Sequence, residues 1–500
     1  MNISKILSTF LLSTLSVATL NSCENRTVAK VTPNDIRVEK NVVPVEKRNV
    51  DLLFVIDTSG SMVEEQQSLL NNFPVFINEL ENIQGGLPNI HIGVISPDVG
   101  AGDSGACGPG QNGNLQAIPN QANFPELTGC TGLDGNDKFI VDEDVEGNEG
   151  QRRVNYQGSL EDTFRCIAAL GTGGCGFEQP LEAISQALNP QNVANAGFLR
   201  DDAFLGIVVI TDEDDCSAIP SQATALYGAT GAGPESELGP QHSFRCFEQG
   251  VVCQPDPMTP AERRIAGPRQ DCETRENSQF MNPVQGYVDE LKALKDDPLD
   301  VFVATIAGPT ERVEVGPFCD ASETLIPGFV DLQNACSDVQ VTDSCPQNVP
   351  AKAHPAIRLS EFSSSQSFPD RSSTQSICNQ DLSGPLQEIA DVLASAVGSP
   401  CLTNTPVDLN PDPNVESFDC NVFDVTDPRT PSERDVRVDS CSANGGELPC
   451  WQISSDMDCE ANLRLDVCRG SADDESGCPQ GDEIPVEDNT EVQSECFVNP

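Results

Sequence analysis

The sequence predicts an α/β protein built on a doubly wound, mostly parallel sheet. Two apolar runs, VDLLFVI from Val50 and AFLGIVVI from Ala203, have the composition of strands buried on both faces of a parallel sheet. Segments with helical periodicity lie between runs of this kind, and that alternation is typical of a sheet with helices on both faces. A cysteine-rich C-terminal region adds short alternating runs, which predict a smaller β-rich part.

The remaining elements follow in chain order. After the first strand we expect a helix over 61–83, which Pro74 should kink or split, because proline cannot donate the helical hydrogen bond. The later expectations are a strand at 90–96, helices at 159–170, 177–188 and 280–294, a strand at 300–308 and a closing helix at 383–397. Cysteine-bearing insertions are expected at about 97–157, 216–275 and 309–380.

These elements divide the chain into four parts. Residues 1–22 have the basic start and short apolar run of a secretion signal, and 23–49 form a polar stretch expected to act as a tether. The main domain is expected over 50–400, and a small cysteine-rich, β-rich segment over 401–500. No apolar run is long enough for a membrane helix, which needs about 20 residues.

The charge of the chain excludes one class of partner. Only 28 Lys and Arg stand against 78 Asp and Glu, so the formal net charge is −50. A chain this acidic repels phosphate backbones, which excludes nucleic acid. Cations or basic surfaces remain as partners, and the charge alone is equally explained by solubility.

The cysteines indicate the compartment. The chain has 21 cysteines, dispersed rather than grouped in the pairs that bind zinc or iron–sulfur clusters. Numerous dispersed cysteines predict disulfides and therefore an oxidising compartment. The sequence does not fix their pairing, although Cys166 and Cys175 flank one loop and are a candidate disulfide.

The odd cysteine has a candidate explanation at the N-terminus. The stretch Leu20-Asn21-Ser22-Cys23 resembles the lipobox of bacterial lipoproteins. That resemblance implies lipidation of Cys23, anchoring in a bacterial envelope and, from Glu24, sorting to the outer membrane. Without Cys23 the number of cysteines is even. The alternative is an ordinary cleaved signal followed by an unrelated cysteine.

Hard oxygen ligands follow both of the buried strands. Asp57, Ser59 and Ser61 come after the first strand, and Asp212 comes after the second. Ligands of open parallel sheets bind at the carboxyl ends of strands, near the point where strand order reverses. Two aspartates on neighbouring strands repel unless a cation lies between them, and carboxylate and hydroxyl oxygens suit a hard divalent ion. The sequence therefore predicts a cation site there.

The segment Asp57-Thr58-Ser59-Gly60-Ser61 resembles the D-x-S-x-S motif of the von Willebrand factor type A domain, a Rossmann-like fold with a metal-ion-dependent adhesion site. The resemblance implies Mg²⁺, or Ca²⁺ or Mn²⁺, held by Asp57, Ser59, Ser61, Thr172 and Asp212. It also implies a partner protein that offers a carboxylate to the metal. The alternative for this motif is that its aspartates only cap helices.

The other candidate sites have weaker sequence signals. With three histidines in the chain, no nucleophile–His–Asp arrangement or zinc motif is present, so we expect no enzyme. The acidic run 142–150 has calcium ligands without the spacing of an EF-hand loop. Asp214 and Asp215 are expected at the rim of the cation pocket.

The function predicted from the sequence is metal-dependent adhesion or protein–protein interaction by a lipid-anchored envelope protein. The alternative is an envelope scaffold or an acidic cation buffer whose metal only stabilises loops.

Overall fold

The computed structural model describes residues 37–44 and most of 49–498. The residues outside it are 1–36, 45–48, 83–86, 121, 126, 128, 129, 131, 132, 136, 146, 147, 229–235, 240, 255–257, 296, 320–323, 338–344, 346–351, 370, 380, 398–401, 403, 404, 408–417, 427–433, 456–462, 471–477, 480–483, 485–489, 499 and 500. The predicted signal peptide 1–22 and the predicted lipidation site Cys23 therefore lie outside the described residues.

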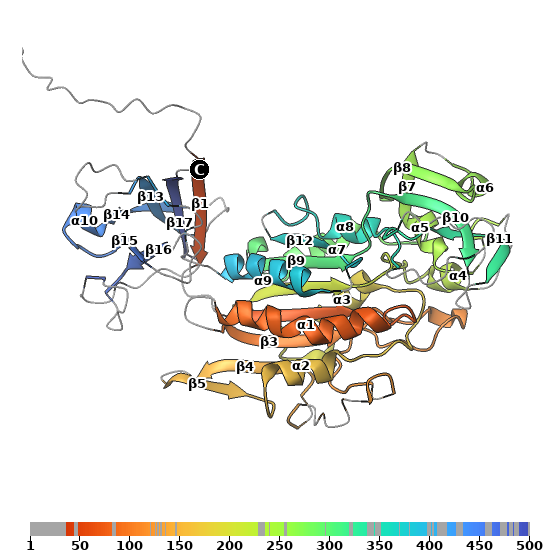
Figure 1. Ribbon diagram of the computed structural model, residues 1–500, viewed down its shortest axis with the longest axis horizontal. Coiled ribbons are helices and arrows are strands. Elements are labelled where there is room, and N and C mark those ends of the chain that lie inside the picture. The colour runs from red at the N-terminus through yellow and green to blue at the C-terminus, as the bar shows by residue number, and fades with distance from the viewer. Residues whose placement is uncertain are drawn as a thin grey trace, which may run out of the picture.

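A seven-stranded sheet forms the centre of the main domain (Figure 1). In sheet order its strands are β12 (Ser372–Ser376), β9 (Val301–Ala307), β6 (Phe204–Ile210), β2 (Asn49–Ile56), β3 (Asn89–Ile95), β4 (Ile140–Val145) and β5 (Asn148–Val154). The first five are parallel, and β4 and β5 are antiparallel. The predicted α/β fold with a mostly parallel sheet is confirmed. The chain starts at β2, moves outward to β3 and later continues on the other side with β6, so strand order reverses between β2 and β6.

Helices cover both faces of this sheet. One face carries α1 (Val63–Glu81), α2 (Leu160–Ala168) and α9 (Ser383–Val397), and the other carries α3 (Pro180–Leu188), α7 (Val284–Lys292) and α8 (Ile357–Phe362). Strand β2 explains why two layers are needed. Leu52 and Phe54 enter the first core, whereas Leu53 and Val55 enter the second, since successive strand side chains point to opposite faces.

Helix α1 differs from the sequence prediction at Pro74. One helix runs through this proline, which neither ends nor splits it. Its apolar stripe explains the tolerance, because Phe73 and Phe76 are fully buried and pack edge-on against Phe54, with ring centroids 6.0 and 5.8 Å away. Burial of such rings contributes about 2–3 kcal/mol each, which offsets the lost hydrogen bond.

The expected insertions take part in two sheets. Strands β4 and β5, from the first insertion, and β12, from the third, extend the central sheet. The second and third insertions also combine in a four-stranded antiparallel sheet of order β11-β10-β8-β7. Its strands are β7 (Val251–Gln254), β8 (Gly267–Thr274), β10 (Val313–Cys319) and β11 (Leu325–Leu332). The second insertion also contains the short helices α4 (Ala223–Tyr227), α5 (Phe244–Gly250) and α6 (Pro260–Arg263). Elsewhere in the main domain, 3₁₀ turns are formed by Gly102–Ser104, Val193–Asn195 and Pro298–Asp300.

The C-terminal region forms a separate six-stranded sheet, drawn mostly in blue in Figure 1. Its order is β1 (Arg37–Pro44), β17 (Thr490–Val498), β13 (Cys420–Thr426), β14 (Arg434–Ser440), β15 (Cys450–Ser455) and β16 (Leu463–Cys468), with α10 (Cys441–Asn444) between β14 and β15. Trp451 is 6% exposed in its core. Strand β1 lies in the stretch expected as a tether, and it pairs along its whole length with β17.

Nine disulfides link all eighteen cysteines that the structure describes. The prediction of a disulfide-rich protein is confirmed, and this density indicates an extracytoplasmic, oxidising compartment. Within the described part of the chain, no helix combines the length and the apolar character needed to cross a membrane.

Candidate metal centre

Asp57 forms the floor of the candidate site. It directly follows β2, its side chain is fully buried, and its carboxylate accepts hydrogen bonds from the Ser59 N–H (2.6 Å) and the Thr211 hydroxyl (2.5 Å). Gly60 and Ser61, the next residues of the loop, are exposed. The motif therefore has a buried base and an open rim.

Asp212 faces this motif from the neighbouring strand. It follows β6 and is 5% exposed, and its Oδ1 accepts no hydrogen bond. On the motif facing it, the Ser59 and Ser61 Oγ atoms are 3.2 Å apart. Because β2 and β6 are the strands between which the order reverses, the predicted residues Asp57, Ser59, Ser61 and Asp212 meet at the switch point of the sheet.

The loop of Thr172 is joined to the motif by Gln66 of α1. The Gln66 amide N–H donates to the Asp57 carbonyl (2.7 Å) and to the Gly171 carbonyl (2.9 Å), and its oxygen accepts from Gly171 N–H (3.0 Å). Thr172 is half-buried, and its hydroxyl accepts from the Asn123 amide at 3.4 Å. The loop is thus beside the motif, with the Thr172 hydroxyl already engaged.

Gly174 explains the glycine-rich character of that loop. Its N–H donates to the Thr58 carbonyl at 2.9 Å, and a Cβ at this position would lie 2.1 Å from the Thr58 Oγ1. Any other residue would force the two loops apart. The Thr172 loop can therefore approach the Asp57 motif only because residue 174 has no side chain.

Several buried carboxyl groups gather here, and none of them forms an ion pair with a described lysine, arginine or histidine. Burial raises the pKa of Asp57, and hydrogen bonds from Thr211 and Ser59 offset part of that rise. Burial, followed by the charge of Asp57, raises the pKa values of Asp212 and of Glu178 well above the ordinary range. Each of these groups resists ionisation in the metal-free protein, because nothing positive compensates the charge.

Two residues of the site, Gln66 and Glu178, were not predicted from the sequence. Gln66 lies in the buried stripe of α1 between Met62 and Leu69, and a polar residue in such a stripe is a detectable signal. Glu178 immediately precedes α3 and its N-cap and is 1% exposed. Its position beside the glycine-rich loop at 171–176 could have indicated a site residue. The apolar periodicity of 177–188 instead placed it in a predicted helix.

The prediction that Asp214 and Asp215 line the rim of the pocket is wrong. Asp214 caps α8, since its carboxylate accepts from the backbone N–H groups of Arg358 and Leu359 at 3.0 and 3.1 Å. Asp215 is fully buried and pairs with the Arg358 guanidinium at 2.9 and 3.0 Å. Both carboxylates fix the loop after Asp212 and do not face the cation site.

The disulfide proposed between Cys166 and Cys175 is also wrong. Cys175 bonds Cys107, and Cys166 bonds Cys130, so both join the first insertion to the domain. A sequence cannot reveal pairing between segments that meet only after folding.

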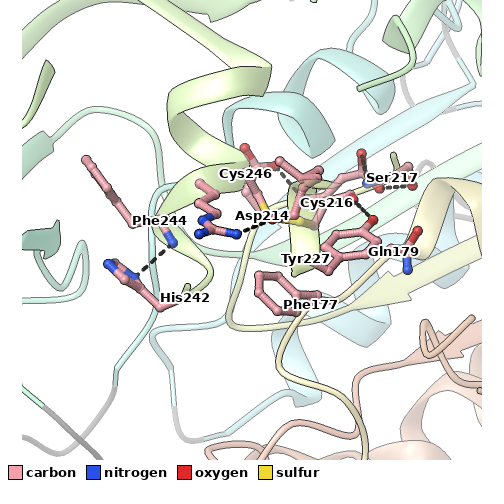
Figure 2. The surroundings of a disulfide bond; sticks show 12 residues. Phe177, Gln179, Asp214, Cys216, Ser217, Tyr227, His242, Phe244 and Cys246 are labelled. Atoms are coloured by element: carbon pink, nitrogen blue, oxygen red, sulfur yellow. Dashed lines mark hydrogen bonds between the residues drawn. A yellow bond between two sulfur atoms is a disulfide. The ribbon is translucent and has the colours of Figure 1, made fainter. Parts of the chain in front are cut away.

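Figure 2 shows the disulfide that supports the other loop of the site. Cys216, four residues after Asp212, bonds Cys246 of α5. Tyr227 donates to the Cys216 carbonyl at 2.6 Å, and its ring lies 4.9 Å from that of Phe177, the neighbour of Glu178. The segments before α3 and after β6 are therefore packed together as one unit.

Removal of the Cys107–Cys175 disulfide tests its support of the site. We expect a Cys107→Ala/Cys175→Ala variant to lose about 2–5 kcal/mol of unfolding free energy and to bind divalent cations more weakly, because the Thr172 loop becomes free to move. Calorimetric cation titration measures the second effect. The matched control, Cys441→Ala/Cys450→Ala in the C-terminal sheet, should leave cation affinity unchanged. Equal affinity in both variants would contradict the support role.

The acidic run 142–150 is not a loop for calcium. Its described residues belong to β4 and β5, which pair as antiparallel strands. Asp142 accepts from Arg152 at 2.5 Å, and Glu143 pairs with Arg153 and Arg200. Arginine side chains, rather than a metal ion, neutralise these carboxylates.

Comparison with known proteins gives limited information. No family model and no curated protein matches the chain. Two structures of the pilus adhesin SpaC from Lactobacillus rhamnosus GG align over 93% of the chain, with 9% and 11% identity and a TM-score of 0.28 in both cases. A von Willebrand factor type A protein from Catenulispora acidiphila aligns over 93% of the chain at 10% identity and a TM-score of 0.25.

This chain covers 42% and 44% of the chain in the two SpaC structures and 65% of the von Willebrand factor type A chain. TM-scores of this size do not establish a common fold. Membership of the von Willebrand factor type A family is accordingly a proposal that depends on the D-x-S-x-S motif and on the strand order around it.

Proposed function

We propose that the carboxyl edge of the central sheet binds a divalent cation and that the bound ion mediates interaction with a partner protein outside the cytoplasm. The observation that carries this proposal is a group of buried oxygens without hydrogen-bond donors. Among the described residues, Thr58 Oγ1 in the motif, Asp212 Oδ1 on the neighbouring strand and Glu65 Oε2 in the first turn of α1 have no hydrogen-bond partner. Buried acceptors without donors cost free energy unless an ion or water satisfies them.

The donor set fits a hard cation. Carboxylates of Asp57 and Asp212 with the hydroxyls of Ser59, Ser61 and Thr172 are oxygen ligands of the kind that Mg²⁺, Ca²⁺ and Mn²⁺ prefer. When bound, the ion would supply charge neutralisation and a Lewis-acidic position for an external oxygen ligand.

The exposed rim favours interaction over a purely structural metal. Gly60, Ser61, Gly173 and Gly174 are all exposed, whereas Asp57 below them is not. An ion held at the floor could therefore be reached from solvent by a carboxylate of a partner. The proposed function is binding rather than catalysis, because the oxygens at this position suit a metal ion that a partner can reach.

Substitution of Asp212 tests the cation site. We expect Asp212→Asn to lower cation affinity by about 10- to 100-fold, since the charge is lost while the side chain keeps its shape. Isothermal titration calorimetry with Mg²⁺, Ca²⁺ and Mn²⁺ measures this. Asp201→Asn, at an exposed turn before β6, is the matched control and should bind as the wild type does. Wild-type affinity in Asp212→Asn would refute the site.

A second experiment separates interaction from the scaffold alternative. Pull-downs from bacterial envelope extracts are compared with and without chelator, using Asp212→Asn as the negative control. Partner capture that is lost in chelator while the protein stays folded supports the interaction function. Loss of the fold in chelator, with capture unaffected by Asp212→Asn, supports a metal that only stabilises loops.

Lipid anchoring at Cys23 in the outer membrane belongs to the same proposal, and mass spectrometry of the membrane-extracted protein tests it.

A further inference from the structure

Glu178 is a buried carboxylate. Its side chain is 1% exposed, and neither of its oxygens accepts a hydrogen bond from any residue that the structure describes. The backbone around it is held firmly: the Glu178 carbonyl accepts from Cys216 N–H at 2.8 Å, and Gln179 donates to the carbonyls of Pro97 (3.0 Å) and Gly100 (2.7 Å). The carboxylate is thus placed in the interior by segments on both of its sides.

The surroundings of Glu178 are acidic. The Gly174 N–H donates to the Thr58 carbonyl at 2.9 Å, which holds the loop before Glu178 against the Asp57 motif. Burial, followed by the charges of Asp57, Glu213 and Asp98, raises the pKa of the Glu178 carboxyl. Neighbouring buried carboxylates need either a shared proton or a cation between them.

Three other buried carboxylates of this chain form ion pairs with arginine. Asp51 pairs with Arg200 at 2.8 Å, Asp215 with Arg358 at 2.9 Å, and Glu248 with Arg264 at 2.8 Å. Each has a guanidinium partner, as expected for an ionised group away from water. Within the described part of the chain, no arginine pairs with Glu178, so its buried carboxyl has no positive partner there.

We propose that Glu178 supplies a third carboxylate to the cation site and that the site so built selects Ca²⁺ over Mg²⁺. This inference rests on the cation site proposed above. Mg²⁺ is usually held by one or two carboxylates and keeps several waters, whereas Ca²⁺ takes six to eight oxygen ligands and accepts more carboxylates in flexible geometry. Asp57, Asp212 and Glu178 would carry three negative charges against the two positive charges of the ion.

The test compares wild type, Glu178→Gln and Asp212→Asn by calorimetric titration with Ca²⁺ and, separately, with Mg²⁺. We expect the wild type to bind Ca²⁺ more tightly than Mg²⁺. Glu178→Gln should lose about tenfold or more in Ca²⁺ affinity and less in Mg²⁺ affinity. Glu64→Gln, an exposed glutamate on the first turn of α1, is the matched control and should change neither.

Thermal unfolding in chelator distinguishes a ligand from a structural residue. Glu178→Gln replaces a buried carboxyl, which costs stability at neutral pH because it resists ionisation, with an amide that does not ionise. The metal-free variant should therefore melt at a higher temperature than the metal-free wild type at neutral pH. A lower melting temperature would mean that Glu178 serves packing alone and would overturn the inference.

The remaining outcomes are also decisive. If Glu178→Gln binds Ca²⁺ as tightly as the wild type while Asp212→Asn does not, or if the wild type prefers Mg²⁺, the inference fails and the cation site stands. If the wild type binds none of these ions, the cation site itself fails.

Discussion

An Arg358→Met variant is expected to lose about 3–5 kcal/mol of unfolding free energy, because a buried charge is left without its partner. Arg358 and Asp215 are both fully buried, and the guanidinium also donates to the Asn282 carbonyl at 2.8 Å. The pair connects α8 to the loop after β6 that carries Asp212. The loss should therefore weaken the cation site as well as the fold.

Urea unfolding followed by far-ultraviolet circular dichroism measures this change in the helical main domain. Fluorescence is unsuitable, since the single tryptophan, Trp451, lies in the C-terminal sheet. Arg358→Met/Asp215→Asn, which removes both charges, should recover part of the stability. Arg153→Met is the matched control: Arg153 is 70% exposed and pairs with Glu143 at the surface, so its loss should cost about 1 kcal/mol or less. Equal losses at the two arginines would contradict the argument.

The metal-free protein is expected to become more stable on acidification from about pH 7.5 to about pH 5. Burial raises the pKa of Asp214 to about 6 and those of Asp57, Asp212 and Glu178 above their ordinary range. Between the ordinary and the raised pKa, the native state binds more protons than the unfolded chain does. Stability therefore falls as pH rises through this window, and the penalty is absent below about pH 4.

Urea midpoints in chelator across this pH range measure the effect. In saturating Ca²⁺ the trend should weaken or reverse, because the ion binds ionised carboxylates and competes with protons. At a free Ca²⁺ concentration 1,000 times the dissociation constant, the ion should add about 4 kcal/mol to the stability near neutral pH. A metal-free protein that loses stability on acidification over this range would show that the carboxylates are compensated by groups of the chain itself.

The sequence predicted those parts of the fold whose signal is local. Strands β2 and β6 are buried on both faces, so their continuous apolar runs could be recognised, and the aspartates after them could be placed at one edge of one sheet. The mostly parallel architecture followed from the alternation of such strands with helices.

The missed features depend on residues distant in sequence. Gln66 joins the two loops of the site because it donates a hydrogen bond to the Gly171 carbonyl, 105 residues away in the chain. Asp215 does not face the cation site because it pairs with Arg358, which is distant in sequence. The sheet of β7, β8, β10 and β11 joins two insertions separated by α7 and β9, and disulfide pairing is likewise a tertiary property. The split that was one of the two expected effects of Pro74 does not occur, because aromatic packing holds α1 together through the proline.

The pairing of β1 with β17 constrains the order in which the protein can fold. The first described strand meets the last described one, with Arg37 opposite Val498, so this edge of the C-terminal sheet cannot close until β17 has been synthesised. Such a contact is delayed by its sequence separation, whereas the central sheet can assemble earlier from strands that are closer in the chain. A polypeptide cut short before β17 would leave β1 and β13 as exposed edges, which are templates for aggregation.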